Sequence, residues 1–457
     1  MKKQILFFAA ISYFTGISEV SAQSKENIAT NNFSLKQCID YALQNNSSMK
    51  NATLGEAIAK SKVNEVTGIG LPQANGSVQL LHNDPLRRMF LGAGNPFFPL
   101  PEGTKSLAID NIFQLKSAAD AGVTVSQLIF SNSYLVGLQA AKTYREISVK
   151  TTEQTKIQII EQVTKAYYMV LVNEERMKLF EKNIARVDSI LAQTKAMYQN
   201  GMVENIDVSR MQVAYNNLTT EKEKFSNLMV LSKVLLKYQM AMPLESELIL
   251  MEKIDDFKIE NITQENATKI NFSSRIERSL LETQNRLQML ELKNNKGAYL
   301  PSLAAFANVG YFSQSPKFDW FTATNPWYNY GMFGVTMSVP IFDGFQKHNK
   351  IQQSKLNLKI TENNIENLER TIDLQVKSAD VAFKNSLASL EMQKKNIELA
   401  KEVARVSKAK YEQGVGSNLE VVSAETALKE AQTNYYNSLY DLLVAKVDLD
   451  KAMGNLK

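Results

Sequence analysis

The sequence has few of the residues on which most enzymes depend. Its 457 residues include one Cys, Cys38, and two His, His82 and His348. A single Cys excludes a disulfide framework within the chain and a cysteine-rich metal site, and two distant His leave little for imidazole chemistry. Carboxylate pairs such as Asp255 and Asp256 stand in charged stretches without a nearby Gly-rich loop or nucleophile motif. We therefore expect no enzyme, no cofactor and no bound metal.

Glycine, proline and excess charge are scarce as well. The chain has 19 Gly and 10 Pro, below the usual content of about 7% and about 5%, so long uninterrupted elements are expected. Its 52 Lys and Arg against 47 Asp and Glu leave a net charge of +5. This charge is too small for the size of the chain to indicate an electrostatic grip on nucleic acid. We expect no nucleic-acid partner.

The N-terminus has the layout of a secretory signal peptide. Lys2 and Lys3 precede an apolar run at residues 5–10, and small residues lead up to Ala22. This layout predicts export and cleavage after about Ala22. Cys38 lies well past the apolar run, so we expect an unmodified, buried thiol. No later stretch approaches the roughly 20 apolar residues of a membrane-spanning helix, and an exported chain that crosses a membrane would do so as strands.

The same ordered set of segments occurs twice in the sequence. Residues 122–130 resemble residues 334–342, and residues 195–201 resemble residues 408–414. Such internal similarity predicts two homologous halves. The predicted divisions are a signal peptide at 1–22, a first structural repeat at 23–242, a polar connector at 243–272 and a second structural repeat at 273–457.

An apolar residue recurs every seven positions in each half. The two series are Val163, Val170, Met177, Ile184, Leu191 and Tyr198, and Val376, Phe383, Leu390, Ile397, Ala404 and Tyr411. A seven-residue period keeps an apolar seam on one face when helices supercoil. In the first half it predicts a helix from about 131 to 199, roughly 100 Å long at about 1.5 Å per residue. Returning helices are predicted to end near Met240 and Met453, with further helical segments at about 35–66 and 274–298.

Four segments between these helices alternate with period two instead. The apolar positions of one face include Val78, Leu80, Val123, Val125, Val309, Val335, Met337 and Val339. The opposite faces carry small polar residues, and no charge stands in the four predicted strands. Strands of about ten residues with this alternation are typical of outer-membrane proteins, so the apolar face is expected to contact lipid. The segments at 82–120 and 313–330 are predicted to be loops. Four strands leave two edges unpaired in lipid, so closure requires several copies of the chain.

Together these features resemble the TolC-like outer-membrane efflux proteins, also called outer membrane factors. The resemblance rests on the duplicated segments, on the strand-to-helix segment at 339–344 and on the glycine turns at 198–207 and 411–421. It implies a mostly α-helical fold with membrane β-strands. Coiled-coil hairpins would form a periplasmic α-barrel, and the strands of a homotrimer would form one 12-stranded outer-membrane β-barrel.

The resemblance also implies a function and partners. The trimer would be an open conduit in a tripartite efflux or type I secretion system. Its partners would be a periplasmic adaptor (membrane fusion) protein and an inner-membrane efflux pump or ABC exporter. The alternative is an exported coiled-coil structural or adhesin-like protein, which would share the heptads but would not need the alternating strands. The transported substrate is not encoded in any of these patterns.

Two groups of site residues follow from the resemblance. The adaptor-docking tips would be Gly201, Met202, Val203, Gly414, Val415 and Gly416, where glycine permits a tight turn and close approach. The alternative is that these glycines serve only as helix caps. The periplasmic gate would involve Asp188, Glu402 and Arg405. Glu402 and Arg405 are three residues apart and so can pair on one helix face, and a merely solvated pair is the alternative.

Overall fold

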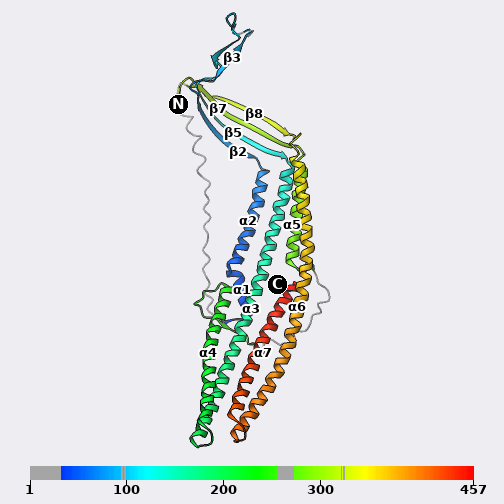
Figure 1. The fold of residues 1–457 in the computed structure, drawn as a ribbon. Coiled ribbons are helices and arrows are strands. Elements are labelled where there is room, and N and C mark those ends of the chain that lie inside the picture. The colour runs from blue at the N-terminus through cyan, green and yellow to red at the C-terminus, as the bar shows by residue number, and fades with distance from the viewer. Residues whose placement is uncertain are drawn as a thin grey trace.

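The computed structural model describes residues 32–93, 96, 99–254, 272–320, 322 and 325–456. Within these residues the chain is a long rod of helices that carries a four-stranded sheet at one end (Figure 1). The prediction of a mostly helical chain with some sheet is confirmed. The predicted signal peptide, residues 1–22, lies outside the described residues.

Four helices form the rod and its two hairpins. Helix α3 (Asn132–Gln199) has 68 residues and helix α6 (Gln346–Glu412) has 67, so each is roughly 100 Å long at about 1.5 Å per residue. The returning helices α4 (Asn205–Met240) and α7 (Asn418–Met453) have 36 residues each and end where the sequence predicted. None of the helices within the described ranges is both long and apolar enough to cross a membrane.

Three shorter helices accompany the half of the rod that is nearer the sheet. They are α1 (Leu35–Asn45), α2 (Ser47–Ile69) and α5 (Ile276–Gly297). The prediction of one helix at 35–66 is wrong, because Asn46 adopts an extended conformation with ψ 131° between α1 and α2. Its Oδ1 accepts from the Ser48 amide at 2.8 Å, and its Nδ2 donates to the Gln239 carbonyl at 3.0 Å. Asn46 therefore starts α2 and ties it to the end of α4.

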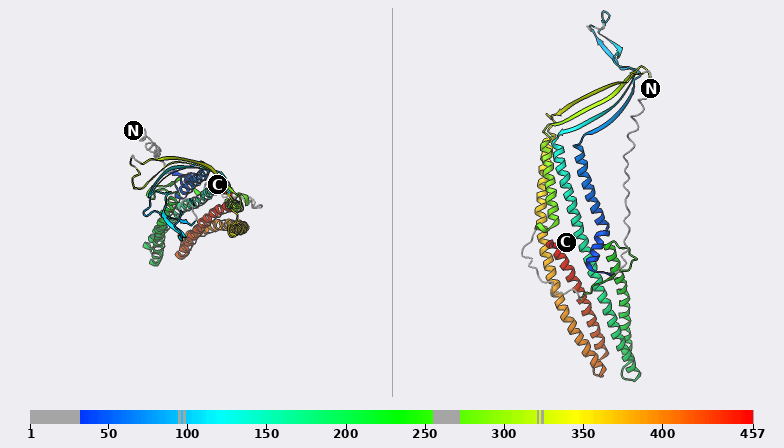
Figure 2. Two further views of the ribbon diagram at one scale, coloured as in Figure 1. Left: turned by 90° about the horizontal axis from the view of Figure 1, so that it is seen from above. Right: turned by 180° about the vertical axis from the view of Figure 1, so that it is seen from behind.

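The helices lie side by side in one curved layer (Figures 1 and 2). Near the sheet the order is α2, α3, α5 and α6, and at the far end it is α4, α3, α7 and α6. Helices α2 and α4 thus form one edge of the layer, and α6 forms the other. The 3₁₀ turn at Phe272–Ser274 leads into α5.

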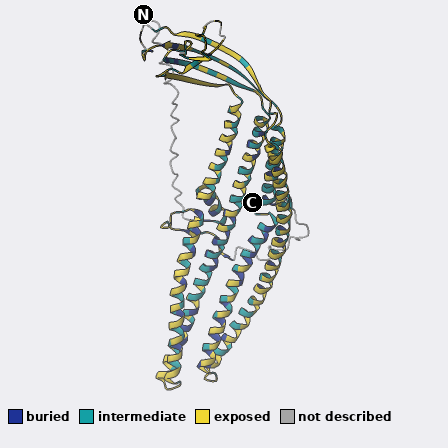
Figure 3. Cartoon of the chain, turned by 45° about the horizontal axis from the view of Figure 1, so that its top comes forward, coloured by how far each residue is buried: buried dark blue, intermediate teal, exposed yellow. Residues whose placement is uncertain are grey.

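The heptad positions supply much of the core between these helices. Val163, Val170, Phe383 and Leu390 are buried, as the seven-residue period predicted. The last positions of the two series differ, because Tyr198 is 45% exposed whereas Tyr411 is 3% exposed. Figure 3 shows buried residues within the rod of helices and exposed residues at the tips, and in the sheet the edge strands β2 and β8 are mainly exposed.

At the middle of the rod, the first described residues pair with the start of the connector. Strand β1 (Asn32–Phe33) pairs in parallel with β6 (Ile249–Leu250). Nearby, Cys38 is fully buried, which confirms the expectation of a buried thiol. The hydroxyl of the fully buried Tyr167 donates to Glu252 Oε2 at 2.9 Å. The rest of the predicted connector, residues 255–271, lies outside the described part of the chain.

The sheet consists of β2 (Gln73–His82), β5 (Ser117–Phe130), β7 (Ser302–Ser315) and β8 (Tyr328–Ser338). The strand order is β2-β5-β7-β8, and every neighbouring pair is antiparallel. Strands β2 and β8 are the edges. Strand β2 leads back to α2, and β8 leads on to α6, so each strand edge continues into the helix edge on the same side (Figure 1).

Three expectations about the strands are wrong. Strand β5 begins at Ser117 and so includes Asp120, which contradicts the prediction of charge-free strands. Strand β8 ends at Ser338, so Val339 lies beyond it, just before Pro340, which has no N–H for a strand ladder. The segment at 82–120 is not a simple loop, because it holds a second hairpin made of β3 (Arg88–Gly92) and β4 (Ser106–Asp110). This hairpin projects beyond the sheet (Figure 1).

Candidate functional site

The turn between α3 and α4 is built on Gly201. This residue has a φ of 70°, in the left-handed region that favours glycine. Its amide donates to the Tyr198 carbonyl at 3.0 Å, and the next amide, of Met202, donates back to the Met197 carbonyl at 2.9 Å. This pattern ends a helix and satisfies its last carbonyl groups. Met202 is left 71% exposed, while Val203 packs partly buried against the apolar cluster beneath the tip.

The turn between α6 and α7 repeats this arrangement at Gly414. Its φ is 73°, and the Val415 amide donates to the Lys410 carbonyl at 3.0 Å. A Cβ atom added to Gly416 would lie 2.9 Å from the Lys410 Cβ, so this glycine is required for close packing. Val415 is 78% exposed. The turn geometry therefore accounts for the glycines as caps and leaves Met202 and Val415 as the exposed apolar residues of the two tips.

Both tips lie at the end of the rod opposite the sheet (Figure 1). The first turns of the returning helices add further apolar surface, since Ile206 is 51% exposed and Leu419 is 57% exposed. Exposed apolar side chains at the end of a rod mark a candidate protein-binding surface.

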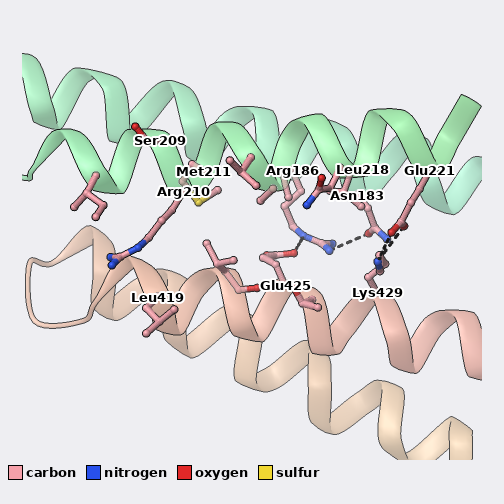
Figure 4. Close-up of a pocket in the computed structure, with 17 residues that line it drawn as sticks. Asn183, Arg186, Ser209, Arg210, Met211, Leu218, Glu221, Leu419, Glu425 and Lys429 are labelled. Atoms are coloured by element: carbon pink, nitrogen blue, oxygen red, sulfur yellow. Dashed lines mark hydrogen bonds and ion pairs between the residues drawn. The ribbon is translucent and has the colours of Figure 1, made fainter.

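A cavity of about 540 Å³ lies between the two hairpins just behind the tips (Figure 4). Helices α3, α4 and α7 form its walls, and Ile206, Met211 and Leu419 are among its apolar lining residues. Charged side chains also line it, namely Arg186, Arg210, Glu221, Glu425 and Lys429. The tips and this cavity together form the candidate site, which we call the tip site.

A hydrogen-bonded network at the tip site joins the two hairpins. Arg186 on α3 donates from Nε to Glu425 Oε2 on α7 at 2.6 Å and from Nη2 to Asn183 Oδ1 at 2.9 Å. Asn183 in turn donates from Nδ2 to Gln432 Oε1 on α7 at 3.0 Å. Asn183, Glu425 and Gln432 are all buried. Because each of these groups has a partner, the network fixes the position of one hairpin relative to the other.

Two further contacts extend this link across the tip site. Lys429 on α7 donates to both carboxylate oxygens of Glu221 on α4, at 3.0 and 3.1 Å. Closer to the tips, the buried Tyr411 hydroxyl on α6 donates to Thr194 Oγ1 on α3 at 3.2 Å. The sequence analysis missed this set of polar residues. The one signal for these residues in the sequence was Glu425, a charged residue that shares an otherwise apolar helix face with Val421 and Leu428.

The three gate candidates are only partly brought together. Arg405 and Glu402 form a two-point ion pair on α6, with nitrogen–oxygen distances of 2.8 and 2.6 Å. The hydrogen bond from Arg405 lowers the pKa of Glu402, and both side chains are more than half exposed. Asp188 is exposed on α3, and no hydrogen bond or ion pair joins it to Glu402 or Arg405 in the described part of the chain. A single chain therefore does not join Asp188 to the pair.

The strand register gathers the predicted apolar residues on one face of the sheet. Val123 pairs with Val309, Val125 pairs with Ala307, and Ala307 pairs in turn with Phe333. By the alternation of side chains along a strand, this face also holds Val78, Leu80, Val335 and Met337. Val78, Val309 and Val335 are 72%, 58% and 62% exposed. The opposite face carries polar partners such as Asn75, Thr124 and Asn308, which stand in one row.

The described part of the chain holds neither a cluster of metal ligands nor a reactive thiol. No group of three or more His, Cys, Asp or Glu side chains there is arranged to hold a metal ion. Burial, followed by the charge of Glu252, raises the pKa of the Cys38 thiol to about 12. A thiol with this pKa is uncharged at neutral pH and is a poor nucleophile.

The comparisons with known proteins agree with this geometry. The sequence profile of the outer membrane efflux protein family matches residues 38–232 and 291–455. TolC of Vibrio cholerae is 22% identical over 340 residues, which are 74% of this chain and 76% of that protein.

Two solved structures share the fold. The structure of CusC covers 92% of this chain, and 91% of CusC is matched, at a TM-score of 0.73 and 14% identity. The open-state MtrE outer membrane channel of Neisseria gonorrhoeae covers 93% of this chain, and 89% of it is matched, at a TM-score of 0.72 and 18% identity. The chain thus belongs to the outer membrane efflux protein family, whose members are channels rather than enzymes.

Proposed function

We propose that this chain is the outer-membrane channel of a tripartite efflux or type I secretion system and works as an open trimeric conduit. Family membership supports the efflux role and the outer-membrane location. The observation that carries the proposal is the separation of two exposed apolar surfaces, a sheet face at one end and the tips at the other, by helices roughly 100 Å long. A coiled-coil structural or adhesin-like protein would need no such sheet face.

The unpaired edges of the chain support a homotrimer. Strands β2 and β8 have no further strand partner among the described strands. The adjoining helix edges carry exposed apolar residues, with Leu54 and Ile58 on α2 at 60% and 67% and Leu374 and Val381 on α6 at 67% and 56%. Contact between the α2 edge of one copy and the α6 edge of the next would be head-to-tail, and such a contact makes a ring when the rotation between copies closes. Three copies would supply twelve strands.

In this ring the two faces of the sheet have different surroundings. The apolar face, with Val78, Leu80, Val123, Val125, Val309, Val335 and Met337, would contact outer-membrane lipid. The polar face would line the channel. The similar lengths of α3 and α6 and of α4 and α7 support two structural repeats at 23–242 and 273–457, joined by a connector at 243–272.

At the other end, the tip site would receive the periplasmic adaptor. Met202 and Val415 offer exposed apolar side chains at the points farthest from the membrane. The cavity behind them provides both apolar and charged lining for a partner helix. The adaptor would connect the trimer to an inner-membrane efflux pump or ABC exporter.

The gate would lie a few turns before the tips. Three copies of Glu402 around the axis would bring carboxylates together, and such rings favour cations. In each copy Arg405 is the direct partner of Glu402. Asp188, on a different helix, would have to approach this pair from a neighbouring copy or act separately.

The proposal can be tested by membrane fractionation together with an export assay. The mature chain should be recovered in the outer-membrane fraction as a trimer that dissociates on heating in detergent. A strain lacking the chain should accumulate a fluorescent efflux substrate or retain a secreted protein, and the gene should restore transport. Recovery as a periplasmic monomer with no change in transport would contradict the proposal.

A further inference from the structure

Asp120 is unusual among the strand residues. It is the only Asp, Glu, Lys or Arg in β2, β5, β7 and β8. The register pairs it with Gln79 on β2 and Phe312 on β7. Asp120 lies two residues from Gly122, on the same face as Thr124 and therefore on the polar face of the sheet. It stands near the end of the sheet that is farther from the helices, because β5 runs from Ser117 there to Phe130 at the start of α3.

A tyrosine from the edge strand reaches across the sheet to this carboxylate. The Tyr330 hydroxyl on β8 donates to Asp120 Oδ1 on β5 at 3.1 Å, although β7 lies between the two strands. Two glycines make this reach possible. A Cβ atom on Gly310 would lie 2.8 Å from the Tyr330 hydroxyl oxygen, and one on Gly122 would lie 2.9 Å from it. The Tyr330 side chain therefore lies along the polar face of the sheet, over Gly310 and Gly122, which have no side chains.

This arrangement orients the carboxylate without neutralising it. A phenol at neutral pH is an uncharged donor, so the hydrogen bond leaves the negative charge of Asp120 in place. No Lys or Arg in the described part of the chain forms an ion pair with Asp120. The other residues of its row, Gln79, Phe312 and Tyr328, are uncharged as well. Its field is thus uncompensated along the polar face of the sheet.

We propose that Asp120 sets a cation preference at the outer mouth of the channel. This inference rests on the proposed trimer, in which the polar face lines the pore and three Asp120 carboxylates form a ring at one height. A ring of fixed negative charges raises the local concentration of cations and lowers that of anions. Salt screens fixed charges, so the effect should be largest at low salt, because charges act over about 10 Å at 0.1 M and about 3 Å at 1 M.

The test measures the reversal potential of single trimers in planar lipid bilayers under a KCl gradient. Asp120→Asn keeps the shape of the side chain and removes the charge, and should lower the ratio of potassium to chloride permeability by about twofold near 0.1 M, with little change near 1 M. The matched control is Asp110→Asn, which removes the same charge from the projecting β3–β4 hairpin and should leave the ratio unchanged. Tyr330→Phe keeps the carboxylate and should keep the preference.

A rescue variant separates the charge from the residue that carries it. Gln79 is the cross-strand partner of Asp120, so adding Gln79→Glu to Asp120→Asn returns a carboxylate to the same height and should restore the wild-type ratio. An unchanged ratio in Asp120→Asn, an equal loss in Asp110→Asn, or a full loss in Tyr330→Phe would each overturn the assignment. If conductance stays normal in any of these cases, only the role of Asp120 is wrong and the proposed channel function stands. A wild-type trimer that does not conduct would overturn both the role of Asp120 and the proposed channel function.

Discussion

Arg186 on α3 and Glu425 on α7 form an ion pair of 2.6 Å in which the carboxylate side chain is only 8% exposed. The pair joins the first helical hairpin to the second at the level of the tip-site cavity (Figure 4). It is continued by Asn183 and Gln432, so two side chains from each hairpin share one network. The relative position of the hairpins, and with it the shape of the tip site, therefore depends on this contact.

Removing Arg186 should destabilise the hairpin contact. In Arg186→Gln the buried Glu425 carboxylate loses its cation, which costs about 3–5 kcal/mol in a fully buried pair and less here because Arg186 is 29% exposed. We expect a loss of about 2 kcal/mol, seen as a lower midpoint of thermal unfolding by circular dichroism. The control is Arg405→Gln, which breaks a pair with both partners exposed to solvent and should lower the unfolding midpoint much less.

The double variant Arg186→Leu with Glu425→Leu tests whether the cost comes from the unpaired charge. It removes both charges together, so it should recover much of the stability that Arg186→Gln loses. Equal losses in Arg186→Gln and Arg405→Gln would show that the Arg186 pair is no more important than a solvated one.

Cys38 should resist thiol reagents in the folded protein. It is fully buried, and burial together with Glu252 raises the pKa of its thiol to about 12. At pH 7.5 a maleimide should label the native chain far more slowly than the chain in denaturant, as followed by mass spectrometry. Rapid native labelling would show that α1 does not pack as described.

Stability should fall at acidic pH through Glu161. Burial alone would raise the pKa of this carboxyl, but hydrogen bonds from Lys165 at 2.8 Å and Lys451 at 2.7 Å outweigh burial and lower the pKa below its ordinary value of 4.5. A carboxyl whose pKa is lower in the folded state stabilises the fold above its unfolded pKa, and this stabilisation is lost as pH falls through the folded pKa.

The measurement for Glu161 is thermal unfolding between about pH 7 and pH 3. Glu161→Gln should have a lower unfolding midpoint than the wild type at pH 7, and the two midpoints should converge as the pH falls. A constant difference across this range would contradict a role for the ionised carboxylate.

Charge on the two sheet faces should have unequal effects. Val335→Arg places a charge on the apolar face, where it costs about 2–4 kcal/mol per copy at mid-bilayer, and should prevent trimers from reaching the outer membrane. Thr336→Arg is the matched control one residue away on the polar face and should assemble better. Val125→Arg and Thr124→Arg form a second pair on β5. Equal assembly defects within both pairs would show that the faces are assigned incorrectly.

The sequence predicts the long elements well and their contacts poorly. The heptad series locates α3 and α6 because a seven-residue period is set by the local chain. The same period cannot show which helices meet, so the pairing of Arg186 with Glu425, and that of Tyr411 with Thr194, emerges only from the tertiary arrangement. The sequence did not predict the break between α1 and α2 at Asn46, because this break depends on a contact with Gln239, which is remote in sequence.

The strands show the same limit. Alternation predicts the shared face of Val123 and Val309, because each strand carries its own period. It does not reveal Asp120, whose strand begins among small residues where the alternation is weak. Nor does it reveal that Tyr330 crosses Gly310, since that contact depends on the order of three strands.

The most direct test of the account is an export assay on tip variants, because docking at the tips distinguishes a pump component from a passive pore. Met202→Asp and Val415→Asp place charges on exposed apolar side chains outside the glycine positions of the turns. Both should assemble as trimers yet lose export of the cargo and crosslinking to the adaptor, while Met202→Leu and Val415→Ile should retain both. Normal export and unchanged crosslinking in both Asp variants would contradict the account and leave the tips as turns alone.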